Sequence, residues 1–202
     1  MGNGNKVEFL VAVCALVSSI IAIWVAWDQS RVMRAQQDGM VYPVLQVDGF
    51  VSRRDENVAI GIRLENSGVG PALIESLSAS ANGQPITSLE PYRGTLPEGY
   101  QISWTGIVGG AVAPGKQVDP LRLDWRPDEI TDAELTAVTL AWSEVDLEVC
   151  YCSVFQKCWL TSMNQSRAIP TKSCPEGTTD IFEQFGTTGI TPAAAIPDEA
   201  SQ

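Results

Sequence analysis

The sequence predicts a mainly β protein in which one N-terminal transmembrane helix precedes an antiparallel β-sandwich, loosely immunoglobulin-like, and a disordered C-terminal tail. Residues 7–27 are almost entirely apolar. After residue 40, short segments of alternating apolar and polar residues are separated by Gly, Pro and Asn. The last residues contain few large apolar side chains. The expected parts are an N-terminal flank at 1–6, a transmembrane helix at 7–27, a helical stalk at 28–39, a β-sandwich at 40–185 and a disordered tail at 186–202.

The apolar stretch 7–27 has the length and the ends of an uncleaved membrane anchor. At about 1.5 Å per residue it spans the hydrocarbon core, which is about 30 Å thick. Its only charge is Glu8 at one edge, and Trp24 and Trp27 at the other edge suit the membrane–water interface. A cleaved signal peptide would have a shorter apolar region, followed by a small-residue cleavage site.

Small residues recur at every fourth position of this stretch, at Cys14, Ser18, Ala22 and Ala26, and therefore share one helix face. Small side chains let two helices approach closely in lipid, which predicts self-association or docking on a larger membrane partner. The alternative is that Ala and Ser are simply common in membrane spans.

Residues 28–38 are good helix formers, and Gly39 stands where a helix would end, so we expect the anchor to continue as a polar helical stalk. A first strand is expected at 41–47, with Pro43 near its start. The clearest strand signal is at 58–64, where an apolar residue alternates strictly with a smaller or charged one.

The segment Leu64–Ile74 reads LENSGVGPALI and predicts a tight turn. Asn66 can bond its own backbone, Gly68 and Gly70 tolerate positive φ, and Pro71 fixes the exit into the next apolar run. This segment resembles the L-x-N-x-G-x-G-P-A-x-I turn of a group of small bacterial single-pass membrane proteins, in which a β-domain follows the anchor. The resemblance implies the architecture and no particular activity.

The dipeptide Asn82-Gly83 predicts a hairpin between strands at 77–81 and 84–88. Residues 89–101 are rich in Pro and Gly and are expected to form a loop. Further strands are expected at 102–108, 118–125, 136–145, 147–154 and 157–162, with one helical turn at 128–135.

Four of the five cysteines lie near the end of the domain, namely Cys150, Cys152, Cys158 and Cys174. Cys150 and Cys152 would share one face of a strand, and a three-residue loop at 154–156 would place Cys152 opposite Cys158. We therefore predict the disulfides Cys152–Cys158 and, by elimination, Cys150–Cys174. The alternatives are a zinc site with four cysteine ligands or a redox-active pair, although both usually use C-x-x-C spacing and the sequence has C-x-C.

Two signals disagree about the side of the membrane on which the domain lies. Lys6 on one flank nearly balances Arg31 and Arg34 on the other, which leans weakly toward a cytoplasmic domain. An even number of clustered cysteines is typical of an oxidising compartment. We give the cysteines more weight and expect the cell inner membrane, with a periplasmic or otherwise extracytoplasmic domain.

The composition excludes several classes of function. The chain has no histidine, which excludes Ser-His-Asp and Cys-His catalysis and histidine-ligated metal sites. After Asp38 there are 10 Lys and Arg against 21 Asp and Glu, a balance that disfavours nucleic acid as a partner. A short acidic run lacks the D-x-D-x-D-G pattern of a calcium loop and is read as a solvated face, comprising Asp124, Asp128, Glu129, Asp132 and Glu134.

These observations predict a non-enzymatic binding or assembly module, without a cofactor, that engages another protein, a membrane complex or a second copy of itself. The alternative is an envelope thiol-disulfide or metal-handling protein that uses the four clustered cysteines. Bound metal or a reactive thiol would favour the second hypothesis.

Overall fold

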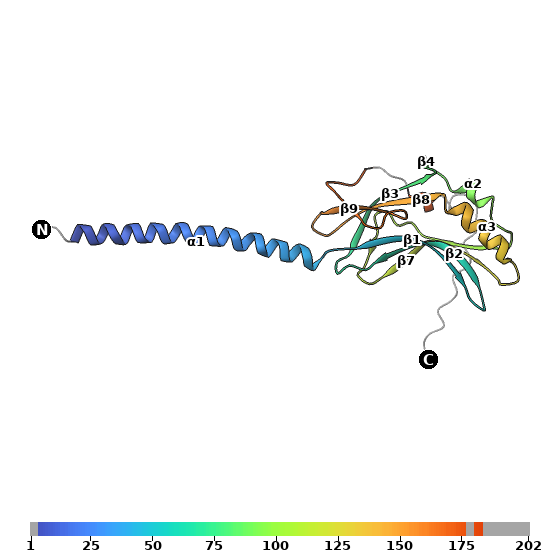
Figure 1. Ribbon diagram of the computed structural model, residues 1–202, viewed down its shortest axis with the longest axis horizontal. Helices are drawn as coiled ribbons and strands as arrows, with labels where there is room; N and C mark the ends of the chain where they lie inside the picture. The colour runs from blue at the N-terminus through green and yellow to red at the C-terminus, as the bar shows by residue number, and fades with distance from the viewer. Residues whose placement is uncertain (1–3, 177–179, 184–202) are drawn as a thin grey trace. The chain divides into compact units, whose positions relative to one another are not determined.

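The computed structural model describes residues 4–176 and 180–183, with side chains from residue 8 onward. The chain divides into two compact units at residues 40 and 41. The first unit contains the helix α1 (Gly4–Met40), which covers both the expected membrane span and the expected stalk (Figure 1). By length and composition this helix is able to cross a membrane. The expected tail at 186–202 lies outside the described residues.

The second unit contains two antiparallel sheets, so its mainly β character is confirmed. The first sheet has the strand order β1-β2-β7-β5, formed by β1 (Leu45–Arg53), β2 (Val58–Asn66), β7 (Gln117–Trp125) and β5 (Gln101–Trp104). The second has the order β10-β9-β8-β3-β4, formed by β10 (Ile169–Thr171), β9 (Cys158–Ser162), β8 (Val145–Cys152), β3 (Ala72–Ala81) and β4 (Gln84–Ile86), and β6 (Ala111–Val112) pairs with β3. An immunoglobulin-like sandwich is not confirmed, because the two sheets are not closed.

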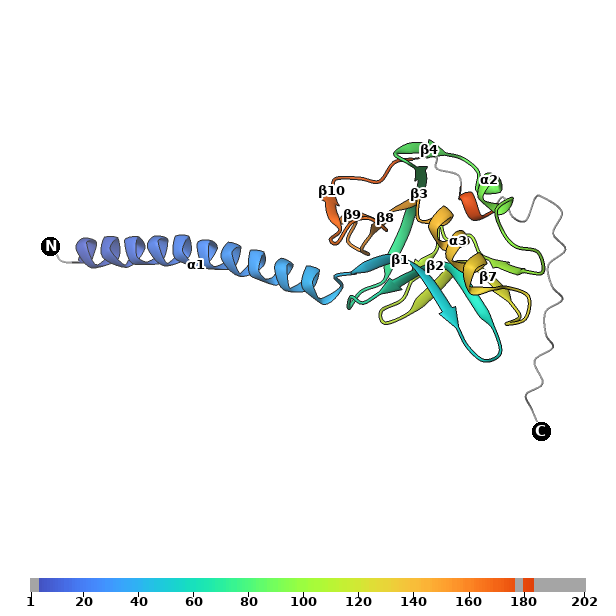
Figure 2. The same cartoon turned by 45° about the vertical axis from the view of Figure 1, so that its right-hand side comes forward.

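The two sheets form separate layers in both ribbon views (Figures 1 and 2), and their facing side chains share one core. On β2 the core residues are those of the alternation expected from the sequence, and Ile62 and Leu64 are buried. On β8 the buried inward residues include Leu147, Val149 and Tyr151. Ile181 and Phe182 of the 3₁₀ helix η1 (Ile181–Glu183) complete this core.

The hairpin at Asn82-Gly83 is confirmed. β3 and β4 pair antiparallel across it, and Asn82 and Gly83 have φ of 51° and 75°. Positive φ at both central residues is the requirement of the turn that matches strand twist. β1 begins only at Leu45, after Pro43, and the loop expected at 89–101 contains the short helix α2 (Glu90–Arg93).

The prediction of a strand at 136–145 is wrong. Residues Asp132–Trp142 form the helix α3. The Thr131 hydroxyl accepts a hydrogen bond from the Glu134 backbone N–H, and the Glu134 side chain accepts one from the Thr131 N–H, so a complete capping box starts the helix. Leu135 and Val138, three positions apart, are buried against the end of the first sheet, whereas Leu140 is 65% exposed. The burial thus follows the helical period and not the alternation of Val138, Leu140 and Trp142.

Candidate functional site

The Asn66 turn holds the start of the β-domain in place. Asn66 is fully buried, and its Nδ2 donates to the carbonyl oxygens of Gly70 and Val112 at 2.8 and 2.9 Å. Its Oδ1 accepts from the backbone N–H groups of Gly68 and Val44 at 3.0 and 3.2 Å. One side chain therefore joins its own turn, the segment before β1 and the strand β6.

The two glycines of this turn are required by close backbone contact and not by positive φ. A Cβ at Gly68 would collide with the backbone at Tyr42 and Pro43, and a Cβ at Gly70 would collide with the backbone of Val41. The expected bond from the Asn66 side chain to its own turn is present, whereas the positive φ expected at Gly68 and Gly70 is absent, and the role of Pro71 stays a prediction. The role of the turn in fixing residues 41–44, which follow the helix α1, emerges only from the structure.

The four clustered cysteines form two disulfides, Cys152–Cys158 and Cys150–Cys174, which is the pairing predicted from the sequence. Cys152 and Cys158 are direct cross-strand partners, and the loop between them has Gln156 with φ of 59°. Backbone hydrogen bonds from Ser153 N–H to Lys157 O and from Gln156 N–H to Ser153 O close this three-residue loop. The Cα atoms of Cys152 and Cys158 are 4.0 Å apart.

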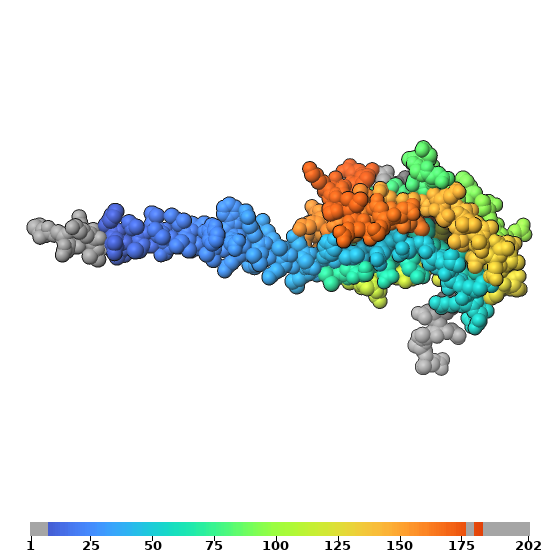
Figure 3. Space-filling model, viewed as in Figure 1, coloured from blue at the N-terminus to red at the C-terminus, as the bar shows by residue number. Residues whose placement is uncertain are grey.

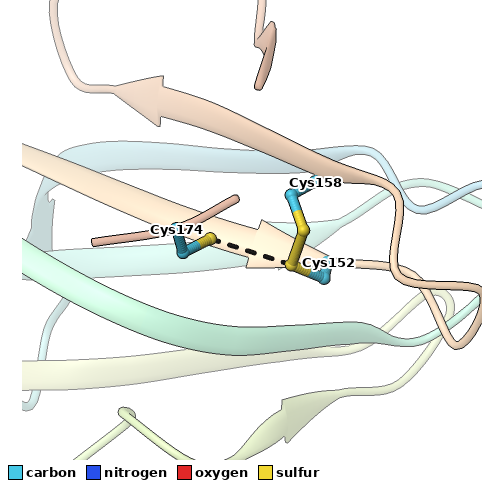
Figure 4. Close-up of side chains that lie close together, drawn as sticks. All are labelled: Cys152, Cys158 and Cys174. Carbon is cyan, nitrogen blue, oxygen red and sulfur yellow. Dashed lines mark hydrogen bonds between the residues drawn. A yellow bond between two sulfur atoms is a disulfide. The ribbon is translucent and has the colours of Figure 1, made fainter. Parts of the chain in front are cut away.

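The two disulfides touch each other. The Sγ atoms of Cys152 and Cys174 are 3.7 Å apart although they belong to different disulfides (Figure 4). The sulfurs of Cys152, Cys158 and Cys174 all lie within 4.8 Å of one another. Zinc requires thiolate ligands, so in this oxidised form the sulfurs are engaged with each other and not available to a metal ion.

Behind this cluster, on the inner face of the same sheet, lies an aromatic pair. Tyr151 stacks on its cross-strand partner Trp159 with ring centroids 5.7 Å apart, and Tyr42 packs edge-on against Trp159 at 5.0 Å. The Tyr151 hydroxyl accepts a hydrogen bond from the Leu45 N–H at 3.4 Å. Burial raises the pKa of Tyr151, and the Leu45 hydrogen bond opposes this shift in part.

A cavity of about 380 Å³ opens between the two sheets beside α3. Its lining comes from both sheets and the helix, and includes Gly49, Val51, Ile60, Leu123, Trp142 and Met163. The lining is mostly apolar, with Thr139, Ser143 and Asn164 among its polar members. Within the described part of the chain, the Trp142 Nε1–H is buried without a hydrogen-bond partner. An apolar cavity with few polar groups is the usual form of a ligand site.

The strand β1 forms one edge of this cavity and of its sheet. Ser67 N–H donates to Val44 O, so with the observed register the even-numbered residues of β1 bond to β2. The backbone groups of Gly49, Val51 and Arg53 therefore point away from β2, and Val51 is 51% exposed. At the surface the atoms of β1 and β2 (cyan) lie beside those of the β9–β10 segment (orange) in Figure 3. We call the backbone of Gly49, Val51 and Arg53 the β1 edge.

Each carboxylate of the acidic run has a partner within the domain. Asp124 bonds Arg122 at 2.8 Å, Asp132 bonds Arg53 at 2.8 Å, and Asp128 lies 4.0 Å from Arg126. A side-chain hydrogen bond from Arg126 lowers the pKa of Glu129, and one from Thr131 lowers the pKa of Glu134. The described geometry therefore agrees with a solvated face and gathers no calcium ligand set.

The small-residue face of α1 is exposed in the described helix. The Ser18 hydroxyl donates to Cys14 O and the Ser19 hydroxyl donates to Ala15 O, both at 2.8 Å. Both hydroxyl donors therefore have their acceptor within the helix. Cys14 is a free thiol. Whether Cys14, Ser18, Ala22 and Ala26 contact a partner stays a prediction.

Sequence reasoning missed the buried carboxylate Asp180. Its Oδ2 accepts hydrogen bonds from the N–H groups of Ile107 and Val108, and its Oδ1 accepts from Phe182 N–H at 2.9 Å. Asp180 is 4% exposed. The only signal in the sequence is the order Asp180, Ile181, Phe182, a turn-forming acid directly before two large apolar residues. This carboxylate fastens the end of the described chain to the loop after β5.

Comparison with protein-family models, curated proteins and solved structures found no match. Function must therefore be inferred from the geometry of the domain itself. The three features that bear on it are the β1 edge with its cavity, the touching disulfides and the apolar helix α1.

Proposed function

We propose that this protein is a membrane-anchored, non-enzymatic binding module whose β-domain takes up an extended segment of another protein along the β1 edge. The observation that supports this most directly is that the edge borders the apolar cavity. Gly49 and Val51 have backbone groups that point away from β2 and pair with no other described strand, and both residues line the cavity. A peptide strand added here would gain main-chain hydrogen bonds, and one of its side chains would enter the cavity.

The lining of the cavity defines the side chain that suits it. Ile60, Leu123 and Met163 offer aliphatic contacts, so an apolar side chain is favoured. The Trp142 ring adds an aromatic side chain to this lining.

The charge of the domain favours a basic partner. After Asp38, 21 acidic residues stand against 10 basic ones, and the chain as a whole has a net charge of −11. Opposite charge on the partner raises the association rate and disfavours acidic competitors. The bound segment is accordingly expected to be extended, apolar at one position and rich in Lys or Arg around it.

The membrane assignment follows from α1 and the cysteines. The helix is long and apolar enough to cross a membrane once, which supports a membrane anchor, and we propose the cell inner membrane as its location. Two disulfides support a periplasmic or otherwise extracytoplasmic domain, because cytoplasmic thiols are normally kept reduced. The small-residue face of α1 offers a second contact to the same membrane complex or to another copy of this chain.

A photocrosslinking amino acid at position 51 in intact membranes tests the binding function. The matched control carries the same crosslinker at Ser103, an exposed residue on β5, the other edge of the same sheet. A discrete adduct formed from position 51 and not from position 103 is expected. An adduct of twice the chain mass would identify the partner as a second copy. Equal labelling from both edges would contradict the proposal.

A proline at position 51 separates edge binding from folding. The Val51 N–H points away from β2, so Val51→Pro removes an edge donor and leaves the β1–β2 ladder intact, as prolines on edge strands do. Val51→Thr keeps the donor and serves as the control. The Pro variant is expected to fold and lose the adduct from a crosslinker placed at Asn164, an exposed residue that lines the cavity. Full retention of the adduct would show that strand pairing is not the mode of binding.

A further inference from the structure

The two touching disulfides join β8, β9 and the segment after β10. Cys150 and Cys152 lie two residues apart on β8 and project to the same face of the sheet. Cys158 comes from β9, and Cys174 comes from the segment after β10. Figure 4 shows the Cys152–Cys158 disulfide, with the Cys174 sulfur aimed at the Cys152 sulfur from the far side.

Cys174 is placed between two alternative partners. Its Sγ is bonded to Cys150 Sγ at 2.01 Å and lies 3.7 Å from Cys152 Sγ. A distance of 3.7 Å is van der Waals contact between sulfurs, so Cys152 needs only a small movement to reach Cys174. Thiol–disulfide exchange requires this kind of approach of a thiolate to a disulfide sulfur.

We propose that these four cysteines form a thiol–disulfide exchange site in which Cys174 passes between Cys150 and Cys152 when an external dithiol reduces the Cys152–Cys158 disulfide. This activity is independent of strand binding at the β1 edge. It uses the outer face of the other sheet, and neither Gly49 nor Val51 takes part in it.

The steps balance with a dithiol as the reductant. One thiolate of the dithiol attacks Cys158 Sγ, which breaks the Cys152–Cys158 bond and releases Cys152 as a thiolate. The second thiol of the dithiol resolves the mixed disulfide, leaving an oxidised dithiol and a free Cys158. The Cys152 thiolate then attacks Cys174 Sγ, the Cys152–Cys174 bond forms, and Cys150 leaves as a thiolate. Two electrons enter in the reduction, and the internal exchange transfers none.

Cys174 is the most exposed of the four cysteines, whereas Cys150, Cys152 and Cys158 are buried, so the choice of Cys158 as the first target rests on the hairpin loop beside it. Cys150 is 1% exposed, so its sulfur is shielded from an external thiol. Cys152 and Cys158 are each 7% exposed, at the base of a hairpin loop whose tip residues Val154 and Phe155 are about half exposed (48% and 50%). The apolar tip offers a contact for a dithiol protein beside the sulfur that it must attack.

Two single variants that remove different partners are expected to converge on the same new disulfide. Both are made in full-length protein with Cys14→Ser, which removes the thiol in α1. In Cys158→Ser, the Cys152 thiol is free and attacks Cys174. In Cys150→Ser, the Cys174 thiol is free and attacks Cys152, releasing Cys158. Each protein is incubated with a catalytic amount of dithiol at pH about 8, where a larger fraction of each thiol is ionised to thiolate. Free thiols are then blocked.

Peptide mapping by mass spectrometry distinguishes the isomers, because cleavage after Tyr151 separates Cys150 from Cys152. The Cys152–Cys174 disulfide is expected at about a tenth or more of the protein in both variants. Its absence from both would overturn the proposal, and either variant alone suffices if the other fails to fold. Cys152→Ser is the control and is expected to retain Cys150–Cys174 with Cys158 free. Equal transfer of Cys174 to Cys158 in this control would indicate unspecific scrambling and also overturn the proposal.

Discussion

The ring of Phe50 lies over Gly61, its direct partner on the neighbouring strand. The two residues face each other in the β1–β2 register, and a Cβ added at Gly61 would come within 2.8 Å of Phe50 Cε1. The Arg63 guanidinium lies over the same ring, 4.4 Å from its centroid. An aromatic ring that covers a glycine in this way replaces the packing which the glycine lacks.

Gly61→Ala is therefore expected to destabilise the domain. The new methyl would collide with the Phe50 ring and with the backbone carbonyl of Leu121, and that carbonyl cannot move without shifting a strand. We expect a loss of about 2 kcal/mol in the free energy of unfolding, measured by denaturant titration in detergent. Gly94→Ala is the control, since its Cβ would lie an ordinary 3.7 Å from Pro91 O. Equal stability of the two variants would contradict this packing.

Asn66→Ala is expected to be among the most damaging substitutions in the chain. It leaves the carbonyls of Gly70 and Val112 and the N–H groups of Gly68 and Val44 without their partner in a buried site. With about 1–3 kcal/mol for each unsatisfied group, a loss of at least about 3 kcal/mol is expected. The exposed neighbour Ser67→Ala should change stability little, and hydrogen exchange at Val44 would report the loosened segment directly.

The sequence predicts best where local rules and cross-strand geometry agree. The Cys152–Cys158 pair follows from C-x-C on a strand and a three-residue loop, both of which are local. The Asn82-Gly83 hairpin is equally local, because its turn type requires those residues. The order of the strands depends on contacts between distant segments, so it cannot be predicted from any local pattern.

The helix α3 shows how a local pattern misleads. Val138, Leu140 and Trp142 alternate like a strand, and β-branched residues strengthen that impression. The capping box at Thr131 and Glu134 is also in the sequence, and it predicts a helix start. Burial decides the outcome, because Leu135 and Val138 both reach the core only at the helical spacing.

The cavity and the β1 edge could not be predicted at all. Gly49 and Met163 are far apart in sequence and become neighbours, 3.1 Å from the position of a Gly49 Cβ to Met163 Cε, only when the two sheets pack. The same holds for the contact between the Cys152 and Cys174 sulfurs, which depends on where the segment after β10 lies.

The two disulfides are expected to contribute unequally to stability. Cys150–Cys174 joins residues 24 apart, and Cys152–Cys158 joins residues 6 apart within a hairpin that already holds them together. In the chain-entropy model the longer loop is worth about 3.5 kcal/mol and the shorter about 2 kcal/mol. Thermal unfolding of Cys150→Ala/Cys174→Ala and Cys152→Ala/Cys158→Ala double variants compares them. A larger loss from the second pair would show that the hairpin depends on its own disulfide.

Asp180→Ala is expected to release the end of the described chain. Three N–H groups lose their acceptor, those of Ile107 and Phe182 in buried positions and that of Val108 in a partly buried one. Unsatisfied donors of this kind are expected to cost about 2–4 kcal/mol in total. Asp180→Asn is expected to restore little of the lost stability, because its amide NH₂ group is a donor and would face backbone N–H groups that are also donors. Faster hydrogen exchange at Ile107, with no change at Asn66, would locate the effect.

The capping box of α3 makes part of the stability dependent on pH. Hydrogen bonds from Thr131 lower the pKa of Glu134 below its ordinary value of 4.5. A group whose pKa is lower in the folded state stabilises the protein above its unfolded pKa, and that contribution is lost as the pH falls through the folded value. The difference in free energy of unfolding between wild type and Glu134→Gln should therefore be greatest above pH 4.5 and shrink below it. A gap between wild type and Glu134→Gln that stayed constant down to the acid limit would mean that the carboxylate acts in the cap only through its shape.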